Sequence, residues 1–136
     1  MCVQKSLALT LCVVISAMFA PAHAADDFAF IAGTYALDAA DCKVAATGKP
    51  FSKELVGALS QDILMPAGIT SPREVHCRFR SAAKSESGWT VKADCEELGE
   101  SSPSEFSVTA GSDGSLAVVS EDVYGPEPQV FKPCPK

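Results

Sequence analysis

The clearest pattern in the chain is a strict alternation of apolar and polar residues in two segments of its second half, residues 73–80 and 89–95. The apolar positions are Val75, Cys77 and Phe79 in the first segment and Trp89, Val91, Ala93 and Cys95 in the second. A period of two residues predicts β-strands that bury one face. The connecting residues 81–88 are small and polar, so the two strands are expected to form a hairpin.

The two cysteines of this hairpin share its apolar face, which predicts a structural role for them rather than a reactive one. If Ser81 opposes Gly88 across the turn, Cys77 and Cys95 lie about three positions out of register. A direct bridge between these two cysteines then requires a register shift or a β-bulge.

Further strands are predicted on both sides of one amphipathic helix. The helix is expected over residues 51–64, because Ser52 is a favourable N-cap at its start. Its apolar stripe consists of Leu55, Val56, Leu59 and Ile63. Residues 106–110 and 115–120 predict a second hairpin around a Gly-rich turn at residues 111–114. The remaining expected elements are a first strand at residues 29–37, a connection at residues 38–50, an acidic loop at residues 96–103 and an edge strand at residues 129–132.

These elements predict a mainly β fold of the α+β type. About six short strands with one covering helix fit a small antiparallel β-barrel or sandwich. A parallel sheet is not expected, because the strands are not separated by crossover helices.

The N-terminus has the three-part pattern of a secretory signal peptide. Lys5 is followed by an apolar run at residues 7–19, and Ala22 and Ala24 supply the small residues of a cleavage site. The apolar run is shorter than the roughly 20 residues that span a bilayer. Residues 1–24 are therefore expected to be cleaved, leaving residues 25–136 as one domain without a membrane span. The expected location is secreted or periplasmic, in a bacterial envelope.

Charge and cysteine content narrow the classes of function. The chain has 136 residues, with 11 Lys and Arg against 17 Asp and Glu. Removal of Lys5 with the signal leaves 10 basic residues and a net charge of −7. An acidic domain is unsuited to nucleic acid, which requires a basic surface. Export to an oxidising compartment predicts two disulfides from four cysteines, with all three pairings open. These cysteines are Cys42, Cys77, Cys95 and Cys134.

No metal site or cofactor is expected. The cysteines lack the close spacing of zinc ligands, and His76 is the only histidine left after signal removal. His76 lies on the polar side of its strand, where Asp94 of the partner strand is expected nearby. A hydrolase built on His76 is one alternative, although the chain has no G-x-S-x-G nucleophile motif.

Contact with a ligand or partner is expected at four positions. The candidates are Trp89, Tyr35, Arg78 and Arg80. Trp89 fits either a core anchor or the wall of a pocket, and the pattern leaves both open. Three acidic residues, Glu96, Glu97 and Glu100, suit either a solvated loop or a basic partner.

Two short motifs carry a resemblance to known proteins. Gly33-Thr34-Tyr35 in the first strand, a cysteine soon after it, and Gly88-Trp89 in a later strand resemble small periplasmic barrel proteins such as the Inh-type proteinase inhibitors of bacteria. The resemblance implies a short N-terminal segment that enters a metalloprotease cleft, and residues 25–30 correspond to it. The chain departs from that family in having Tyr35 in place of tryptophan, an expected helix and four cysteines.

The sequence thus predicts an exported binding or inhibitor-like module. It is expected to act by surface contact with another periplasmic or secreted protein, without catalysis. The alternatives are an envelope or structural accessory protein and the small hydrolase that uses His76.

Overall fold

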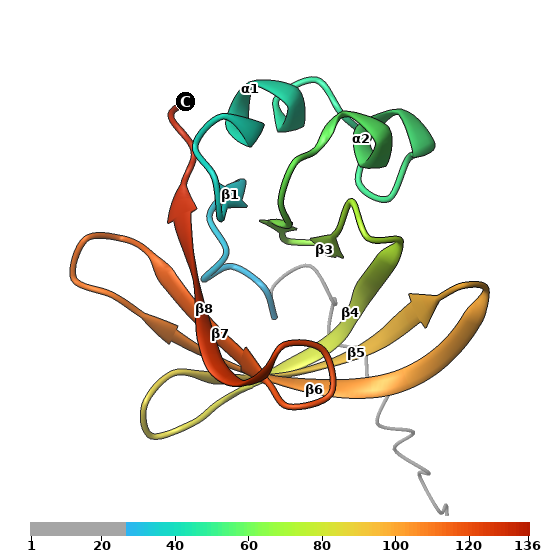
Figure 1. The fold of residues 1–136 in the computed structure, drawn as a ribbon. Coiled ribbons are helices and arrows are strands. Elements are labelled where there is room, and N and C mark those ends of the chain that lie inside the picture. Colours follow the sequence, from blue (N-terminus) through green and yellow to red (C-terminus); the bar gives the residue numbers. More distant parts are fainter. Residues whose placement is uncertain (1–26) are drawn as a thin grey trace, which may run out of the picture.

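The computed structural model describes residues 27–136, and the expected signal peptide lies outside this range. The described chain forms a closed antiparallel β-barrel whose eight strands follow one another in sequence order (Figure 1). The strands are β1 Tyr35–Ala36, β2 Ile63–Met65, β3 Gly68–Thr70, β4 Val75–Lys84, β5 Trp89–Glu97, β6 Glu100–Ala110, β7 Leu116–Ser120 and β8 Gly125–Pro133. Two short helices, α1 Asp41–Ala45 and α2 Lys53–Ala58, lie over β1–β3.

The mainly β class, the antiparallel barrel and two disulfides are confirmed. The barrel has eight strands rather than about six, and its closure by pairing of β8 with β1 excludes the sandwich. Two helices take the place of the single expected one. No helix in residues 27–136 is long and apolar enough to cross a membrane.

The β4–β5 hairpin contains the register shift that a direct cysteine bridge requires. Lys84 opposes Trp89 at its tip, and the register changes between Phe79 and Ser81. Cys77 then lies directly opposite Cys95, and the two form a disulfide. The expected pairing of Ser81 with Gly88 is wrong, because the turn is shorter: the Ser85 amide donates to the Gly88 carbonyl.

The expected acidic loop at residues 96–103 is also absent, because β5 continues to Glu97 and β6 begins at Glu100. Only Leu98 and Gly99 connect them, both with positive φ angles. A two-residue hairpin turn of this kind matches the twist of the flanking strands, so the ladder continues to its end.

The expected helix at residues 51–64 is too long. Ser52 caps α2 as predicted, since its hydroxyl accepts a hydrogen bond from the Leu55 amide, but the helix ends at Ala58. The buried Asp41 carboxylate accepts hydrogen bonds from the amides of Ser60 and Gln61 and thereby stops the helix from continuing. Three members of the expected apolar stripe, Leu55, Leu59 and Ile63, still face one small core, whereas Val56 is half-buried and lies outside this core. The buried residues of this core are Ala36, Ala45, Leu55, Leu59, Ile63 and Met65.

The first strand is shorter than expected, and the last strand is longer. Only Tyr35–Ala36 of the expected strand at residues 29–37 is a strand, and α1 interrupts the expected connection at residues 38–50. Conversely, the expected edge strand at residues 129–132 is the C-terminal half of a longer strand, β8, which pairs with both β7 and β1. Pro126 and Pro128 are tolerated in β8 because they fall where the β7–β8 register shifts.

The barrel core is closed at one end by the residues that precede β1. Phe28 and Ile31 are buried in the main core. The Phe28 ring stacks on Phe79 with centroids 5.6 Å apart, and Phe79 meets Phe106 edge to face at 6.0 Å. We call residues 28–31 the N-terminal plug, because their buried side chains pack against the core side chains of the barrel strands.

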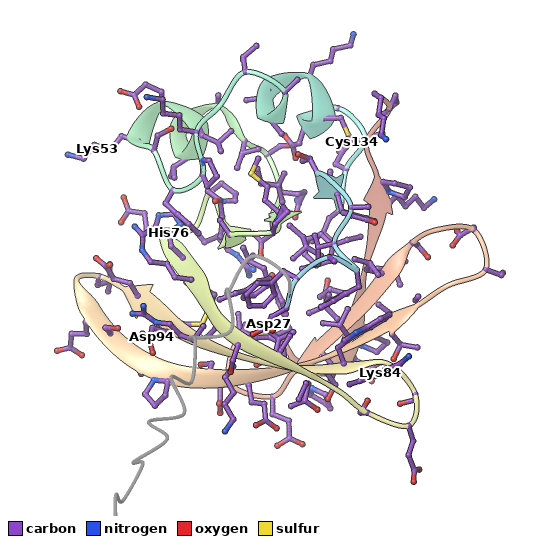
Figure 2. All side chains as sticks on the ribbon, turned by 180° about the vertical axis from the view of Figure 1, so that it is seen from behind. Asp27, Lys53, His76, Lys84, Asp94 and Cys134 are labelled. Atoms are coloured by element: carbon purple, nitrogen blue, oxygen red, sulfur yellow. A yellow bond between two sulfur atoms is a disulfide. The ribbon has the colours of Figure 1, made fainter. Side chains whose placement is uncertain are left out.

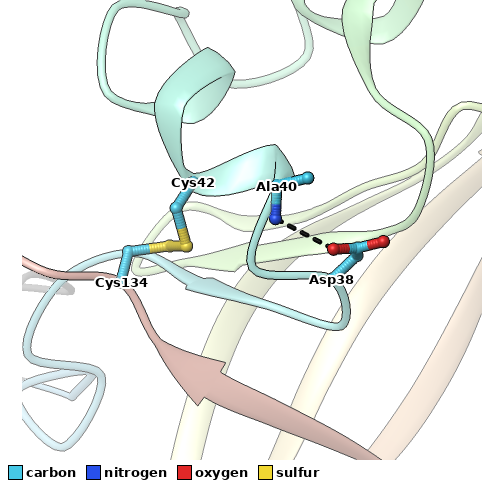
Figure 3. The surroundings of a disulfide bond; sticks show 4 residues. All are labelled: Asp38, Ala40, Cys42 and Cys134. Atoms are coloured by element: carbon cyan, nitrogen blue, oxygen red, sulfur yellow. Dashed lines mark hydrogen bonds between the residues drawn. A yellow bond between two sulfur atoms is a disulfide. The ribbon is translucent and has the colours of Figure 1, made fainter.

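A disulfide between Cys42 and Cys134 holds the end of β8 against α1 (Figure 3). Close to it, the Asp38 carboxylate accepts a hydrogen bond from the Ala40 amide at the start of α1. The Cys134 amide also donates to the Thr34 carbonyl beside β1. The seam that closes the barrel is therefore secured by both covalent and backbone bonds.

Candidate functional site

Two of the four expected contact residues are aromatic, and the structure places both inside the fold. Tyr35 is 7% exposed and belongs to the main core, and it also lines a hollow next to the Cys42–Cys134 disulfide, so its contact with a ligand or partner stays a prediction. Trp89 is half-buried, and its ring stacks on Phe30 with centroids 4.2 Å apart and planes inclined by 7°. Trp89 thus packs against Phe30 of the N-terminal plug.

This stacking makes the single tryptophan a reporter of the plug. Replacing Phe30 with alanine uncovers one face of Trp89, so we expect its fluorescence emission to move to longer wavelength as water reaches the indole. Phe51→Ala removes an aromatic ring from the other side of β4 and is the matched control, expected to leave the emission unchanged. Equal emission spectra for Phe30→Ala and the wild type would show that Phe30 does not cover Trp89 in solution.

The two expected arginines engage side chains of their own chain. Arg78 lies over the Phe51 ring at 4.2 Å from its centroid, a cation–π contact. Arg80 forms an ion pair with Asp94 on the exposed face of the β4–β5 hairpin. Both remain exposed and accessible to a partner, although each already has an interaction within the chain.

His76 is half-buried on β4 and has different neighbours from those expected. Glu96 opposes it across the hairpin, whereas Asp94 opposes Arg78. Burial lowers the pKa of His76 below its usual value, although the nearby carboxylate of Glu96 acts in the opposite direction. Its Nδ1 is inaccessible to solvent and has no hydrogen-bond partner among residues 27–136. No described serine or cysteine side chain donates a hydrogen bond to His76.

A hollow of about 580 Å³ lies beside His76, between α2 and the tip of the β5–β6 hairpin. Figure 2 shows Lys53 of α2 and His76 of β4 on the same side of the molecule. We call this hollow the turn groove. Its lining residues are Phe51, Lys53, Val56, Gly57, Glu74, His76, Glu96, Leu98 and Gly99.

All three described non-glycine residues with positive φ angles line the turn groove. They are Phe51 at 63°, Glu74 at 62° and Leu98 at 52°. The left-handed conformation costs an ordinary L-residue roughly 1–2 kcal/mol. Such residues gather at functional sites, where the conformation serves to present a side chain.

Leu98 is the least expected residue of the groove. Its side chain is 82% exposed at the tip of the β5–β6 hairpin. A two-residue turn with two positive φ angles favours Asn or Asp at this first position, followed by the Gly that is present. Leucine therefore carries backbone strain and exposed apolar surface at once, without a compensating contact in the fold. Glu96, Glu97 and Glu100 surround it with negative charge.

Sequence reasoning noted the three glutamates but missed Leu98, because residues 96–103 were expected to be a loop without defined geometry. The available signal was Leu98-Gly99 between the pair Glu96-Glu97 and Glu100, where an apolar residue occupies a turn position. The groove itself depends on Phe51, Glu74 and Leu98, which are far apart in the chain and carry no common motif.

Within residues 27–136 no three His, Cys, Asp or Glu side chains are grouped so as to hold a metal ion. Comparison of the chain with known proteins found no matching family model, no matching curated protein and no matching solved structure.

Proposed function

We propose that this chain is an exported binding module that acts by protein surface contact, with the turn groove as its contact site. The observation that carries the proposal is the convergence of three strained residues and the exposed Leu98 on one hollow. Residues that break local conformational preferences without a structural gain are expected where function requires them.

The chemistry of the groove defines the partner it suits. Leu98, Phe51 and Val56 offer apolar surface, and an exposed apolar side chain with a polar surround suits the centre of a protein interface. Glu74 and Glu96 outnumber the single Lys53 within the lining. The partner is therefore expected to present an apolar side chain flanked by basic residues.

An inhibitor-like role is the finer form of this proposal, with another periplasmic or secreted protein as the target. The N-terminal residues that the resemblance assigns to a protease cleft are largely occupied elsewhere: Phe28 is buried and Phe30 stacks on Trp89. The support for partner contact comes from the turn groove instead. The alternatives, an envelope accessory protein and a hydrolase that uses His76, have no comparable observation in their favour.

Replacing Leu98 with asparagine tests the proposal because it separates folding from binding. Asparagine adopts positive φ more readily than leucine, so we expect the free energy of unfolding to rise by about 0.5–1 kcal/mol, part of the strain at this position. The same change removes the apolar contact, so capture of a partner should fall. Urea unfolding measures the first effect, and affinity capture from an envelope extract with oxidised protein measures the second.

Val130→Asn is the matched control, since Val130 is an exposed apolar residue on β8, far from the turn groove. We expect one partner to be retained in stoichiometric amount by the wild type and Val130→Asn and to be lost with Leu98→Asn. Retention of the same partner by all three proteins would refute the turn groove as the contact site. Capture of no protein by the wild type, with a loss of envelope integrity in its absence, would favour the accessory role.

A further inference from the structure

The two disulfides of the barrel lie in different surroundings. Cys77 and Cys95 are 0% and 5% exposed and belong to the main core, so almost none of their surface is accessible. Cys42 and Cys134 are half-buried at the edge of the small core, where α1 meets the end of β8 (Figure 3). A reductant in solution therefore reaches the second disulfide without unfolding of the chain, whereas the first is covered.

A hollow of about 330 Å³ lies beside the Cys42–Cys134 disulfide, and we call it the seam hollow. Both cysteines line it, together with the core residue Tyr35. Its other lining residues are Ala32, Gly33, Thr34, Ala46, Pro133, Pro135 and Lys136. None of these lining side chains is acidic, so the wall carries no side-chain carboxylate that would repel the thiolate that attacks a disulfide.

The Cys42–Cys134 disulfide is placed where its loss weakens a junction of the fold. It joins α1 to the end of β8, next to the seam that closes the barrel. Only two residues of β1, Tyr35 and Ala36, pair with β8, and the Cys134 amide adds one hydrogen bond to the Thr34 carbonyl. Reduction of this disulfide leaves the seam to these few bonds, while the longer pairings among β4–β8 are untouched.

We propose that the Cys42–Cys134 disulfide is a site of reversible thiol–disulfide exchange with a dithiol reductant, and that its reduction loosens the seam between β8 and β1. Exposed disulfides are the labile and regulatory ones, whereas structural disulfides resist reduction. The seam hollow shares no lining residue with the turn groove, so the test of this proposal does not depend on the proposed protein partner.

The exchange conserves atoms and electrons. A thiolate of the reductant attacks one sulfur of the pair from the seam hollow, which forms a mixed disulfide and breaks the bond between Cys42 and Cys134. The displaced cysteine leaves as a thiolate and takes a proton from water. The second thiol of the reductant, as a thiolate, then attacks the mixed disulfide. The reductant ends as its own disulfide, having supplied two electrons, and both cysteines end as thiols.

The first test treats the oxidised protein under native conditions with increasing concentrations of dithiothreitol. Iodoacetamide quenches the samples at intervals, and peptide mass spectrometry locates the alkylated cysteines. We expect Cys42 and Cys134 to be labelled at least about tenfold faster than Cys77 and Cys95, because only the first pair is accessible in the folded chain. The rate should be proportional to the dithiothreitol concentration. Equal rates for both pairs, earlier labelling of the hairpin pair, or a rate independent of dithiothreitol would each overturn the proposal.

Gly33 provides a matched pair of variants that tests the route of attack. It is exposed, it lines the seam hollow, and a Cβ added at this position meets no atom within 4 Å. Gly33→Glu and Gly33→Lys place opposite charges on side chains of similar length beside the disulfide. A unit charge about 7 Å away in water changes the rate of thiolate attack about threefold, so at low salt we expect slower reduction of Gly33→Glu and faster reduction of Gly33→Lys. Equal rates for the two variants would overturn the seam hollow as the route.

Amide hydrogen exchange tests the structural consequence. In protein reduced and alkylated only at Cys42 and Cys134, we expect faster exchange in β1 and at residues 132–134, with β5 and β6 still protected. Reduced protein freed of dithiothreitol without alkylation should re-form the disulfide in air and regain the original exchange. Unchanged exchange at the seam would overturn the proposed loosening. Loss of protection throughout the barrel would also overturn it, because the change would then be unfolding rather than opening of the seam.

Discussion

Replacing Cys42 and Cys134 together with alanine is expected to lower the free energy of unfolding by about 4–5 kcal/mol. This disulfide closes a loop with a sequence separation of 92 residues, so its removal releases most of the described chain in the unfolded state. In the native state it joins α1 to the end of β8, beside the seam with β1. Since β1 has only two residues, the seam has few other bonds to hold it.

The hairpin disulfide is the matched control for this prediction. Cys77 and Cys95 close a loop of only 18 residues, so their replacement with alanine is expected to cost about 3 kcal/mol. Urea unfolding of the two double variants gives both values. A smaller loss for the Cys42 and Cys134 variant than for the hairpin variant would contradict the view that loop length and the closing seam determine the larger contribution.

Replacing Phe106 with alanine is expected to lower the free energy of unfolding by about 3–5 kcal/mol, since it removes a large, fully buried side chain and leaves a cavity in the core. Phe106 is fully buried on β6, and its ring meets Phe79, which in turn stacks on Phe28 of the N-terminal plug. The cavity that this substitution creates therefore lies where the barrel strands contact the N-terminal plug. Val130→Ala on the exposed side of β8 is the control, with an expected cost within about 0.5 kcal/mol.

The two variants are compared by denaturant unfolding at one temperature. A loss below about 1 kcal/mol for Phe106→Ala would show that the barrel centre is loosely packed or that neighbouring side chains fill the space. It would then also weaken the assignment of residues 28–31 as a plug, because this assignment rests on the same three rings.

The elements with a repeating pattern were predictable from sequence. Alternation located the start of β5 at Trp89 and placed β4 within two to four residues of its ends, since each strand buries one face and exposes the other over several residues. The N-cap at Ser52 was also correct, because capping depends on one side chain and the amide three residues later. Cysteine number in an expected oxidising compartment was enough to predict two disulfides, though not their pairing.

The shortest strands carry no such pattern. β2 and β3 have three residues each, and all six are buried because one face meets the barrel core and the other meets the helices. Without alternation, Ile63 was placed on a helical stripe with Leu59. The actual end of the helix depends on Asp41, which lies far away in sequence and binds the amides of Ser60 and Gln61.

The candidate site also depends on contacts between segments that are distant in the sequence. The turn groove joins Phe51, Glu74 and Leu98, which are far apart in the sequence. Trp89 and Tyr35 were predicted from the sequence as contact residues. In the structure, Trp89 stacks on Phe30 of the N-terminal plug, and Tyr35 is part of the main core of the closed barrel.

By itself, the sequence determined the long strands, the helix cap and the number of crosslinks, because each follows from local periodicity or composition. Only the tertiary structure decided the hairpin register, the cysteine pairing, the closure of β8 on β1 and the turn groove. These features arise when segments remote in the chain compete for the same neighbours, and the most favourable packing of the whole barrel selects among them.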